Sequence, residues 1–146
     1  SWLFETSVGV VDAEYSDMDE AETLISENND LERVPETTFS ASLSKDFSLG
    51  SNGNVRARID YSWRDEQFMD TFNTAEIKQD DYQLINANIA WWSADNRYSA
   101  TLGVNNLDDE DYLISGIVGD AFQSYEGVFA RGREYYLTLR YEFGNE

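Results

Sequence analysis

Strict alternation of apolar and polar residues marks the stretch Arg133–Phe143. Its odd-numbered residues after Arg133 are aromatic or aliphatic, and most of its even-numbered residues are charged or hydroxylated. Since side chains of a β-strand point alternately to two sides, this period of two predicts an amphipathic strand. Aromatic residues at both ends of the apolar face, Tyr135 and Phe143, with full charges on the other face, are typical of a transmembrane β-barrel strand that has lipid outside and a wet lumen inside.

The same pattern predicts six strands: Trp2–Tyr15, Thr37–Phe47, Val55–Trp63, Tyr82–Trp92, Arg97–Val104 and Arg133–Phe143. Each is long enough for a tilted membrane span of about 9 to 11 residues, the fifth only marginally. In the first strand the alternation slips at Val10, which predicts a bulge or an exit from the membrane there. In the second, Lys45 is the only charge on the apolar side, and its position near the strand end lets it snorkel.

The connections between the strands alternate in length. Residues 50–54 and 93–96 form short segments of Gly, Asn, Ser, Asp and Ala, typical of tight turns. Residues 16–36, 65–81 and 105–132 form long segments. Short turns at one rim and long loops at the other are the arrangement of outer-membrane barrels, which have short turns in the periplasm and long loops outside. This arrangement places Phe143 at the periplasmic rim.

Composition restricts the classes of protein that fit. The chain has a net charge of -19 and no apolar run near the roughly 20 residues of a spanning helix, which excludes a membrane helix but not a barrel, since only every second strand residue meets lipid. Its 9 Tyr, 8 Phe and 4 Trp suit a membrane interface. Without cysteine or histidine, we expect no enzyme, no catalytic residues, no metal and no cofactor. Strong acidity argues against nucleic acid as a partner.

Carboxylates gather in the long loops. There are seven with no base in residues 17–32, six beside a single lysine in residues 65–81, and six with no base in residues 108–126. The simple interpretation is that these charges keep the loops solvated. Divalent-cation binding by Asp108–Asp111 or Asp17–Glu20 is an alternative, although neither segment has the frame of a calcium-binding loop.

Three segments resemble TonB-dependent outer-membrane receptors. Val104–Tyr112 is similar to the Asn-Leu-Phe/Thr-Asp-x-x-Tyr segment near the end of those receptors, and Gly132–Phe143 resembles their closing strand. Leu31–Glu36 resembles the proline-containing entry to a descending strand. The sequence departs from the family in two places: Gly144–Glu146 follow the terminal aromatic residue, and residues 130–133 lack the usual proline.

The resemblance implies that residues 1–146 are the C-terminal part of an all-β, antiparallel transmembrane barrel, about six of its 22 strands. Implied partners are outer-membrane lipid, the remaining strands, a plug domain, TonB acting through that plug, and a scarce ligand such as a siderophore, cobalamin or an oligosaccharide. The implied location is the outer membrane of a Gram-negative bacterium. We expect the preceding strands, the plug and the TonB box to lie outside this chain. The acidic loops favour a neutral ligand, and its expected contacts are aromatic loop residues: Phe68, Phe72, Tyr112, Phe122 and Tyr125.

Alternative interpretations remain open at this stage. The loop aromatics would, on the simpler view, pack the loops together or belong to the upper aromatic girdle. Four inward arginines suit either an anion-conducting lumen or pairing with carboxylates on the plug and neighbouring strands; they are Arg56, Arg58, Arg64 and Arg140. A soluble, acidic β-sandwich that binds carbohydrates or surfaces also fits six strands. Against the sandwich, seven aromatics gather toward the short-turn rim: Trp2, Phe47, Trp91, Trp92, Tyr98, Tyr141 and Phe143.

Overall fold

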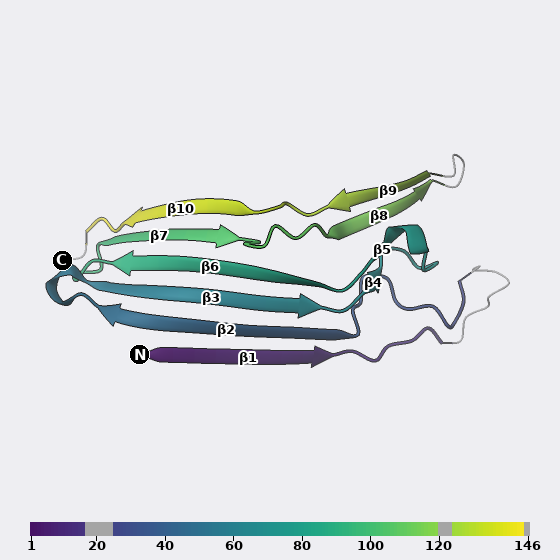
Figure 1. Cartoon of the computed structure of the whole chain (residues 1–146), viewed down its shortest axis with the longest axis horizontal. Coiled ribbons are helices and arrows are strands. Elements are labelled where there is room, and N and C mark those ends of the chain that lie inside the picture. Colours follow the sequence, from purple (N-terminus) through teal and green to yellow (C-terminus); the bar gives the residue numbers. More distant parts are fainter. Residues whose placement is uncertain (17–24, 120–123, 145–146) are drawn as a thin grey trace.

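The chain forms one large antiparallel sheet that carries a layer of loops at one end (Figure 1). The computed structural model describes residues 1–16, 25–119 and 124–144. Six strands pair in the order β1-β2-β3-β6-β7-β10. Their bounds are β1 Trp2–Val10, β2 Thr37–Ser48, β3 Asn54–Arg64, β6 Tyr82–Trp92, β7 Tyr98–Asn105 and β10 Glu134–Tyr141.

These six strands confirm the sequence prediction with small shifts at the ends. β6 has the predicted bounds, and β10 ends at Tyr141 instead of Phe143. β1 ends at Val10, where the alternation slips: the chain leaves the sheet after one further backbone hydrogen bond, from Val11 N to Glu36 O (2.8 Å). The predicted extension to Tyr15 is therefore wrong: the strand ends where the alternation slips, and an exit from the membrane at Val10 stays a prediction.

Four short strands were not predicted, and all lie in the long loops. β4 (Gln67–Phe68) pairs with β5 (Lys78–Gln79), and β8 (Leu113–Gly119) pairs with β9 (Ser124–Phe129). A 3-10 helix, η2 (Ala75–Ile77), precedes β5. Among the described residues, no helical segment is long and apolar enough to cross a membrane.

The short connections are tight turns, as predicted. A 3-10 helix, η1 (Gly50–Asn52), joins β2 to β3, and it ends at Gly53 with φ +96°. A Cβ atom at Gly53 would lie 1.8 Å from the carbonyl oxygen of Trp92, so only glycine fits there. The indole Nε1 of Trp91 donates a hydrogen bond to Asn52 O (2.9 Å), which ties the turn to the sheet.

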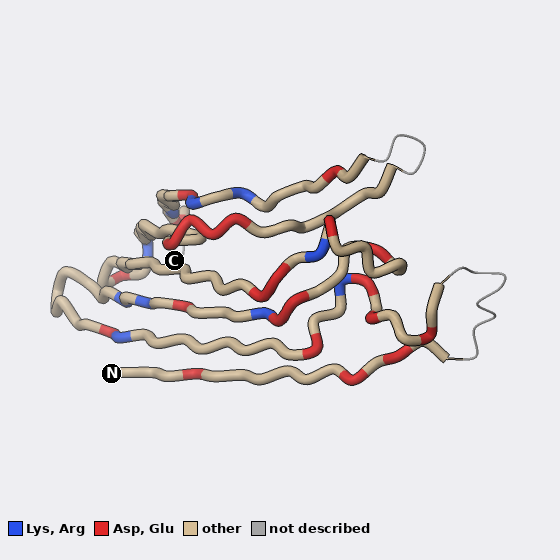
Figure 2. The backbone as a smooth tube through the Cα atoms, turned by 45° about the vertical axis from the view of Figure 1, so that its right-hand side comes forward, with Lys and Arg blue, Asp and Glu red and all other residues tan. Residues whose placement is uncertain are grey.

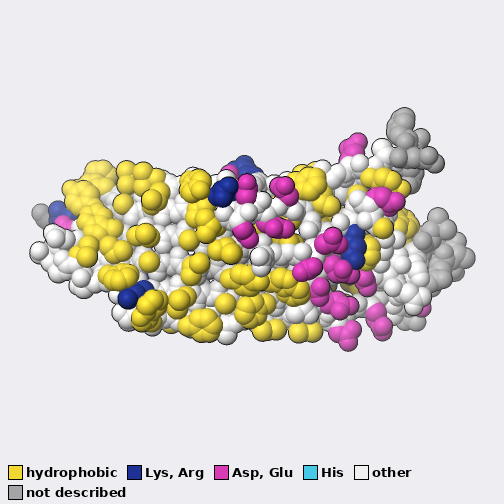
Figure 3. Space-filling view, viewed as in Figure 1, with side chains coloured by type: hydrophobic (Ala, Val, Ile, Leu, Met, Phe, Trp, Pro, Cys, Tyr) yellow, Lys and Arg dark blue, Asp and Glu magenta, His cyan; other side chains and the backbone are white. Residues whose placement is uncertain are grey.

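The strand register separates charge from apolar surface. Cross-strand partners share a face, and within the six long strands every charged residue except Lys45 lies on the same side of the sheet. On the opposite side most large apolar side chains are exposed, among them Trp2, Ile59, Leu102 and Leu139. Figure 3 shows hydrophobic side chains spread over the long strands and acidic side chains gathered near the loop end.

No second sheet packs on the apolar face among the described residues, because the two smaller sheets are the short loop hairpins. A soluble sandwich would bury that face against another sheet. The sandwich alternative is therefore wrong for this chain. The aromatic cluster at the short-turn end is present, with Tyr141 in contact with Tyr98 and with Phe143 at ring-centroid distances of 4.8 and 4.5 Å.

Candidate functional site

The long loops pack into a layer of their own beyond one end of the sheet (Figure 1). Its centre is Ile77 in η2, which is 1% exposed, beside Met69, which is 2% exposed. Both side chains lie against Gly116 of β8, where an added Cβ would come within 2.7 Å of the Ile77 side chain and 3.1 Å of Met69. The most deeply buried side chains that the structure describes thus belong to the loops and not to the sheet, whose faces are largely open.

Hydrogen bonds join the first loop to the second. The amide of Arg33 donates to Phe68 O (2.8 Å), and Asn29 Nδ2 donates to Thr71 O (2.9 Å). Asp30 and Asn73 bond reciprocally: Asp30 N donates to Asn73 Oδ1 (2.7 Å), and Asn73 Nδ2 donates to Asp30 O (3.0 Å). One of these four bonds joins backbone to backbone, and the side chains of Asn29 and Asn73 make the other three to backbone atoms of the facing loop.

The second and third loops are joined in the same way. Oε1 of Gln79, a buried residue, accepts a hydrogen bond from the Leu113 amide, and its Nε2 donates to Asp80 O (2.9 Å). The ring of Tyr112 stacks on that of Tyr82 at the start of β6, with centroids 4.4 Å apart and planes inclined by 13°. The base of the third loop is therefore fixed to both β5 and β6.

The motif Val104–Tyr112 has a structural explanation. Asn106 is buried with φ +53°, and its Oδ1 accepts from Glu110 N (2.8 Å) while its Nδ2 donates to Glu110 O (2.9 Å). Asp109, at φ +62°, accepts from the Arg133 amide (2.6 Å) through Oδ1 and from its guanidinium (3.5 Å) through Oδ2. The motif therefore closes the mouth of the third loop, between the end of β7 and the start of β10.

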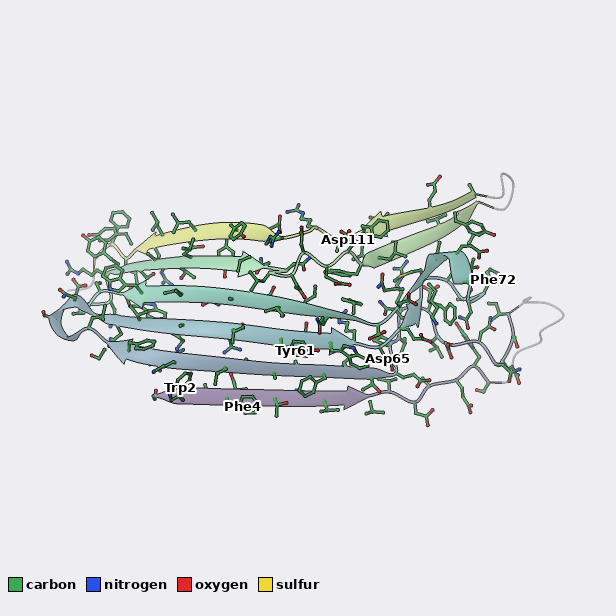
Figure 4. The ribbon with its side chains drawn as sticks, in the orientation of Figure 1. Trp2, Phe4, Tyr61, Asp65, Phe72 and Asp111 are labelled. Carbon is green, nitrogen blue, oxygen red and sulfur yellow. The ribbon has the colours of Figure 1, made fainter. Side chains whose placement is uncertain are left out.

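The structure divides the predicted ligand-contacting aromatics into two groups. Phe72 and Tyr125 are free side chains in the loop layer, 57% and 50% exposed, and Figure 4 shows Phe72 at the outer end of the loops. Tyr112 packs on Tyr82, and Phe68 lies half-buried with Lys78 Nζ 5.4 Å from its ring centroid. Phe122 lies outside the described residues. The loop layer thus brings the four described residues to one end of the molecule, but Tyr112 and Phe68 serve packing.

Charge in the loop layer is strongly negative (Figure 2). Lys78 pairs with Glu66 at 2.7 Å, and this hydrogen bond raises the pKa of the lysine above its usual value. A small hollow of about 150 Å³ lies beside this pair, with Asp30, Glu36 and Asp65 in its wall. Across the described ranges, no three acidic side chains converge as a metal ion would require. Asp17–Glu20 lie outside those ranges, and Asp109 of the other candidate segment pairs with Arg133 instead.

The charged face of the sheet is largely neutralised by its own ion pairs. Arg56 pairs with Asp46 at 2.6 Å, and Arg140 pairs with Glu142 at 2.6 Å. Arg58 pairs with two carboxylates, Asp60 at 2.7 Å and Glu5 at 3.2 Å. Arg64 lies beside Tyr82, its partner on the neighbouring strand. This arrangement favours the interpretation that inward arginines pair with carboxylates. Sequence reasoning did not single out Glu5, because it stands among apolar residues on β1, and only the register brings it opposite Ser42, next to Arg58.

Comparisons with known proteins agree with this geometry. The sequence matches the TonB dependent receptor-like β-barrel family over residues 2–107. A similar solved structure is the ferric yersiniabactin uptake receptor FyuA from Yersinia pestis, with a TM-score of 0.83 and 19% sequence identity. The similarity covers 98% of this chain and 21% of FyuA, so the chain spans about a fifth of that receptor's length, and the likeness is one of fold. No curated protein sequence matches the chain.

Proposed function

The chain belongs to the TonB-dependent receptor β-barrel family, and on that premise we propose that it is the C-terminal part of an outer-membrane receptor that imports a scarce ligand. This is a family of transport receptors and not of enzymes. In this proposal residues 1–146 supply the last six of about 22 strands and three extracellular loops. Other strands pair with the free edges of β1 and β10, because an open sheet edge in lipid leaves backbone donors and acceptors without partners.

One observation supports this function above the others: the sheet is two-sided along its whole length. An exposed apolar face with aromatic residues at its end suits lipid, and an ion-paired opposite face suits a wet lumen or the surface of a plug domain. Because ion pairs neutralise most of the arginines on the polar face, that face offers little unpaired positive charge to conduct anions. The proposed partners are accordingly the outer membrane, the plug, TonB through the plug, and a ligand held at the loop layer.

The charge of the loop layer favours a neutral ligand, such as an oligosaccharide or cobalamin. An anionic ferric siderophore would meet carboxylates around Asp30 and Asp65, whereas Lys78 is already paired with Glu66. Phe72 and Tyr125 offer exposed rings for apolar ligand surfaces. FyuA takes up ferric yersiniabactin, as its name states, but at 19% identity that ligand does not transfer to this chain.

The test uses the full-length receptor. Purified receptor would be titrated calorimetrically with a neutral oligosaccharide series, with cobalamin and with a ferric catecholate. Uptake of the ligand that binds would then be measured in cells with and without TonB. We expect a neutral compound to bind and its uptake to need TonB. Uptake that continues without TonB, or ion flux through the purified protein in a planar bilayer, would instead identify a passive pore.

The role of the loop aromatics is tested by Phe72→Ala, which should weaken ligand binding about two- to tenfold if the ring contacts the ligand. Tyr98→Ala is the matched control, because Tyr98 is an aromatic residue of similar exposure, 52%, at the opposite end of the sheet. Equal affinities for both variants would remove Phe72 from the ligand site without affecting the assignment of the receptor.

A further inference from the structure

Lys45 is the one charge on the apolar face of the six long strands, and it has no acidic partner among the residues that the structure describes. Its ammonium lies 4.5 Å from the ring centroid of Trp2 and 4.8 Å from that of Phe47. Among the carboxylates in the described residues, none forms an ion pair with it, whereas Arg56 and Arg58 on the other face each bind one. Cation–π attraction to the two rings positions the ammonium without neutralising its charge.

The position of Lys45 along the strand fixes its depth. It stands three residues before the end of β2 at Ser48, about 10 Å along the strand from the short turn. A lysine side chain can extend its ammonium toward the membrane surface from such a depth, where a charge is far less costly than at the bilayer centre. Trp2 occupies the same end of the sheet on β1 (Figure 4). The ammonium therefore lies at the level of lipid headgroups, given the orientation in the proposed function.

A hollow of about 500 Å³ with almost wholly apolar walls begins at Lys45. It crosses the central strands, where Ala57 on β3 lies opposite Ile89, and Ala87 on β6 lies opposite Ile59. Ala57 and Ala87 are diagonal neighbours among these four residues. Their small side chains form the floor of the hollow between the larger side chains of Ile59 and Ile89. Apolar hollows of this kind accept hydrocarbon, because burial of apolar surface is favourable and no polar group is left unpaired.

We propose that Lys45 and this hollow bind one phospholipid of the periplasmic leaflet. The phosphate pairs with the Lys45 ammonium, and an acyl chain lies in the hollow over Ala57 and Ala87. The chemistry of the two parts is complementary: a hard anionic oxygen group for the point charge of a lysine, and a hydrocarbon chain for the apolar floor. This inference rests on the proposed function for its orientation, since the phosphate must lie at the short-turn side of the membrane.

The experiment measures binding of defined lipids to the delipidated full-length receptor by native mass spectrometry in detergent. The probes are dioleoyl phosphatidylglycerol, dioleoylglycerol without phosphate, and lipid A. We expect one tightly bound phosphatidylglycerol, and Lys45→Gln should weaken it on the order of tenfold or more. Lys45→Arg should retain binding. Lys78→Gln is the matched control, because that lysine lies in the loop layer, and it should leave binding unchanged.

A second variant tests the hollow separately. Ala57→Leu fills the floor while leaving the ammonium in place, and it should also weaken phosphatidylglycerol binding. Heat-modifiable migration on gels verifies that each variant is folded. Equal binding of dioleoylglycerol and phosphatidylglycerol, a preference for lipid A, or wild-type binding by Lys45→Gln would each overturn the proposal. If the receptor shows TonB-dependent uptake together with any of these results, only the lipid-binding proposal fails. If the protein does not insert into the membrane, or if its uptake does not need TonB, the proposed function fails.

Discussion

Replacing Ile77 with alanine should loosen the loop layer without unfolding the sheet. Ile77 is 1% exposed and packs on Met69 and Gly116, so the substitution removes buried methyl groups and leaves a cavity. Such changes cost about 2–5 kcal/mol in protein cores. The contacts of Ile77 lie within the loops, and the strands are held by their own hydrogen-bond ladders. The loss should therefore appear as local opening of the loops.

Hydrogen–deuterium exchange of the full-length receptor measures this opening directly. A loss of about 2 kcal/mol raises the exchange rate of amides that open with the layer about 30-fold, and a larger loss raises it further. The informative amides are those of Leu113 and Arg33, which bond Gln79 and Phe68 across the loops. Amides of β2 and β3 should be unaffected.

The matched control is Ile117→Ala, which makes the same chemical change at a residue of β8 that is 60% exposed. Its effect should stay within about 0.5 kcal/mol. Two results would refute the reasoning. If Ile77→Ala exchanged no faster than Ile117→Ala, the loops would have no common core. If β2 and β3 amides accelerated equally, the layer would not be a unit separate from the sheet.

Two further substitutions test the faces and the loop motif. Leu137→Arg, on the apolar face, should destabilise the folded receptor in lipid by about 2–4 kcal/mol when the residue lies near mid-membrane, and Thr138→Arg on the opposite face should cost far less. Urea titration of lipid-reconstituted receptor followed by gel mobility checks this, and equal losses would contradict the assignment of the faces. Asn106→Ala should open the third loop more than Asn106→Gly by about 1–2 kcal/mol, because alanine alone pays for the positive φ. Exchange of the Arg133 amide, which donates to Asp109 Oδ1 across the mouth of the third loop, measures this difference, and equal exchange rates in the two variants would show that the positive φ is unimportant there.

The candidate site was less predictable than the sheet. All five ligand-contacting residues were chosen because they are aromatic and stand in long loops, and of the four described, Phe72 and Tyr125 are exposed. Tyr112 turned inward onto Tyr82, a contact between residues thirty positions apart that no local pattern indicates. The short strands β4, β5, β8 and β9 were missed for a related reason, since residues such as Lys78–Gln79 have no alternation to follow.

The sequence by itself determined the six long strands, their two faces and the alternation of turns and loops. The strands and their faces follow from side-chain direction, which reverses at every residue along a strand. The tight turns follow from residues such as Gly53, whose backbone conformation and surroundings only glycine fits. The tertiary structure alone decided which loops pack together, where Ile77 is buried, and that Glu5 meets Arg58. Such contacts join distant segments, and they depend on the register between strands, which local residue patterns specify only in part.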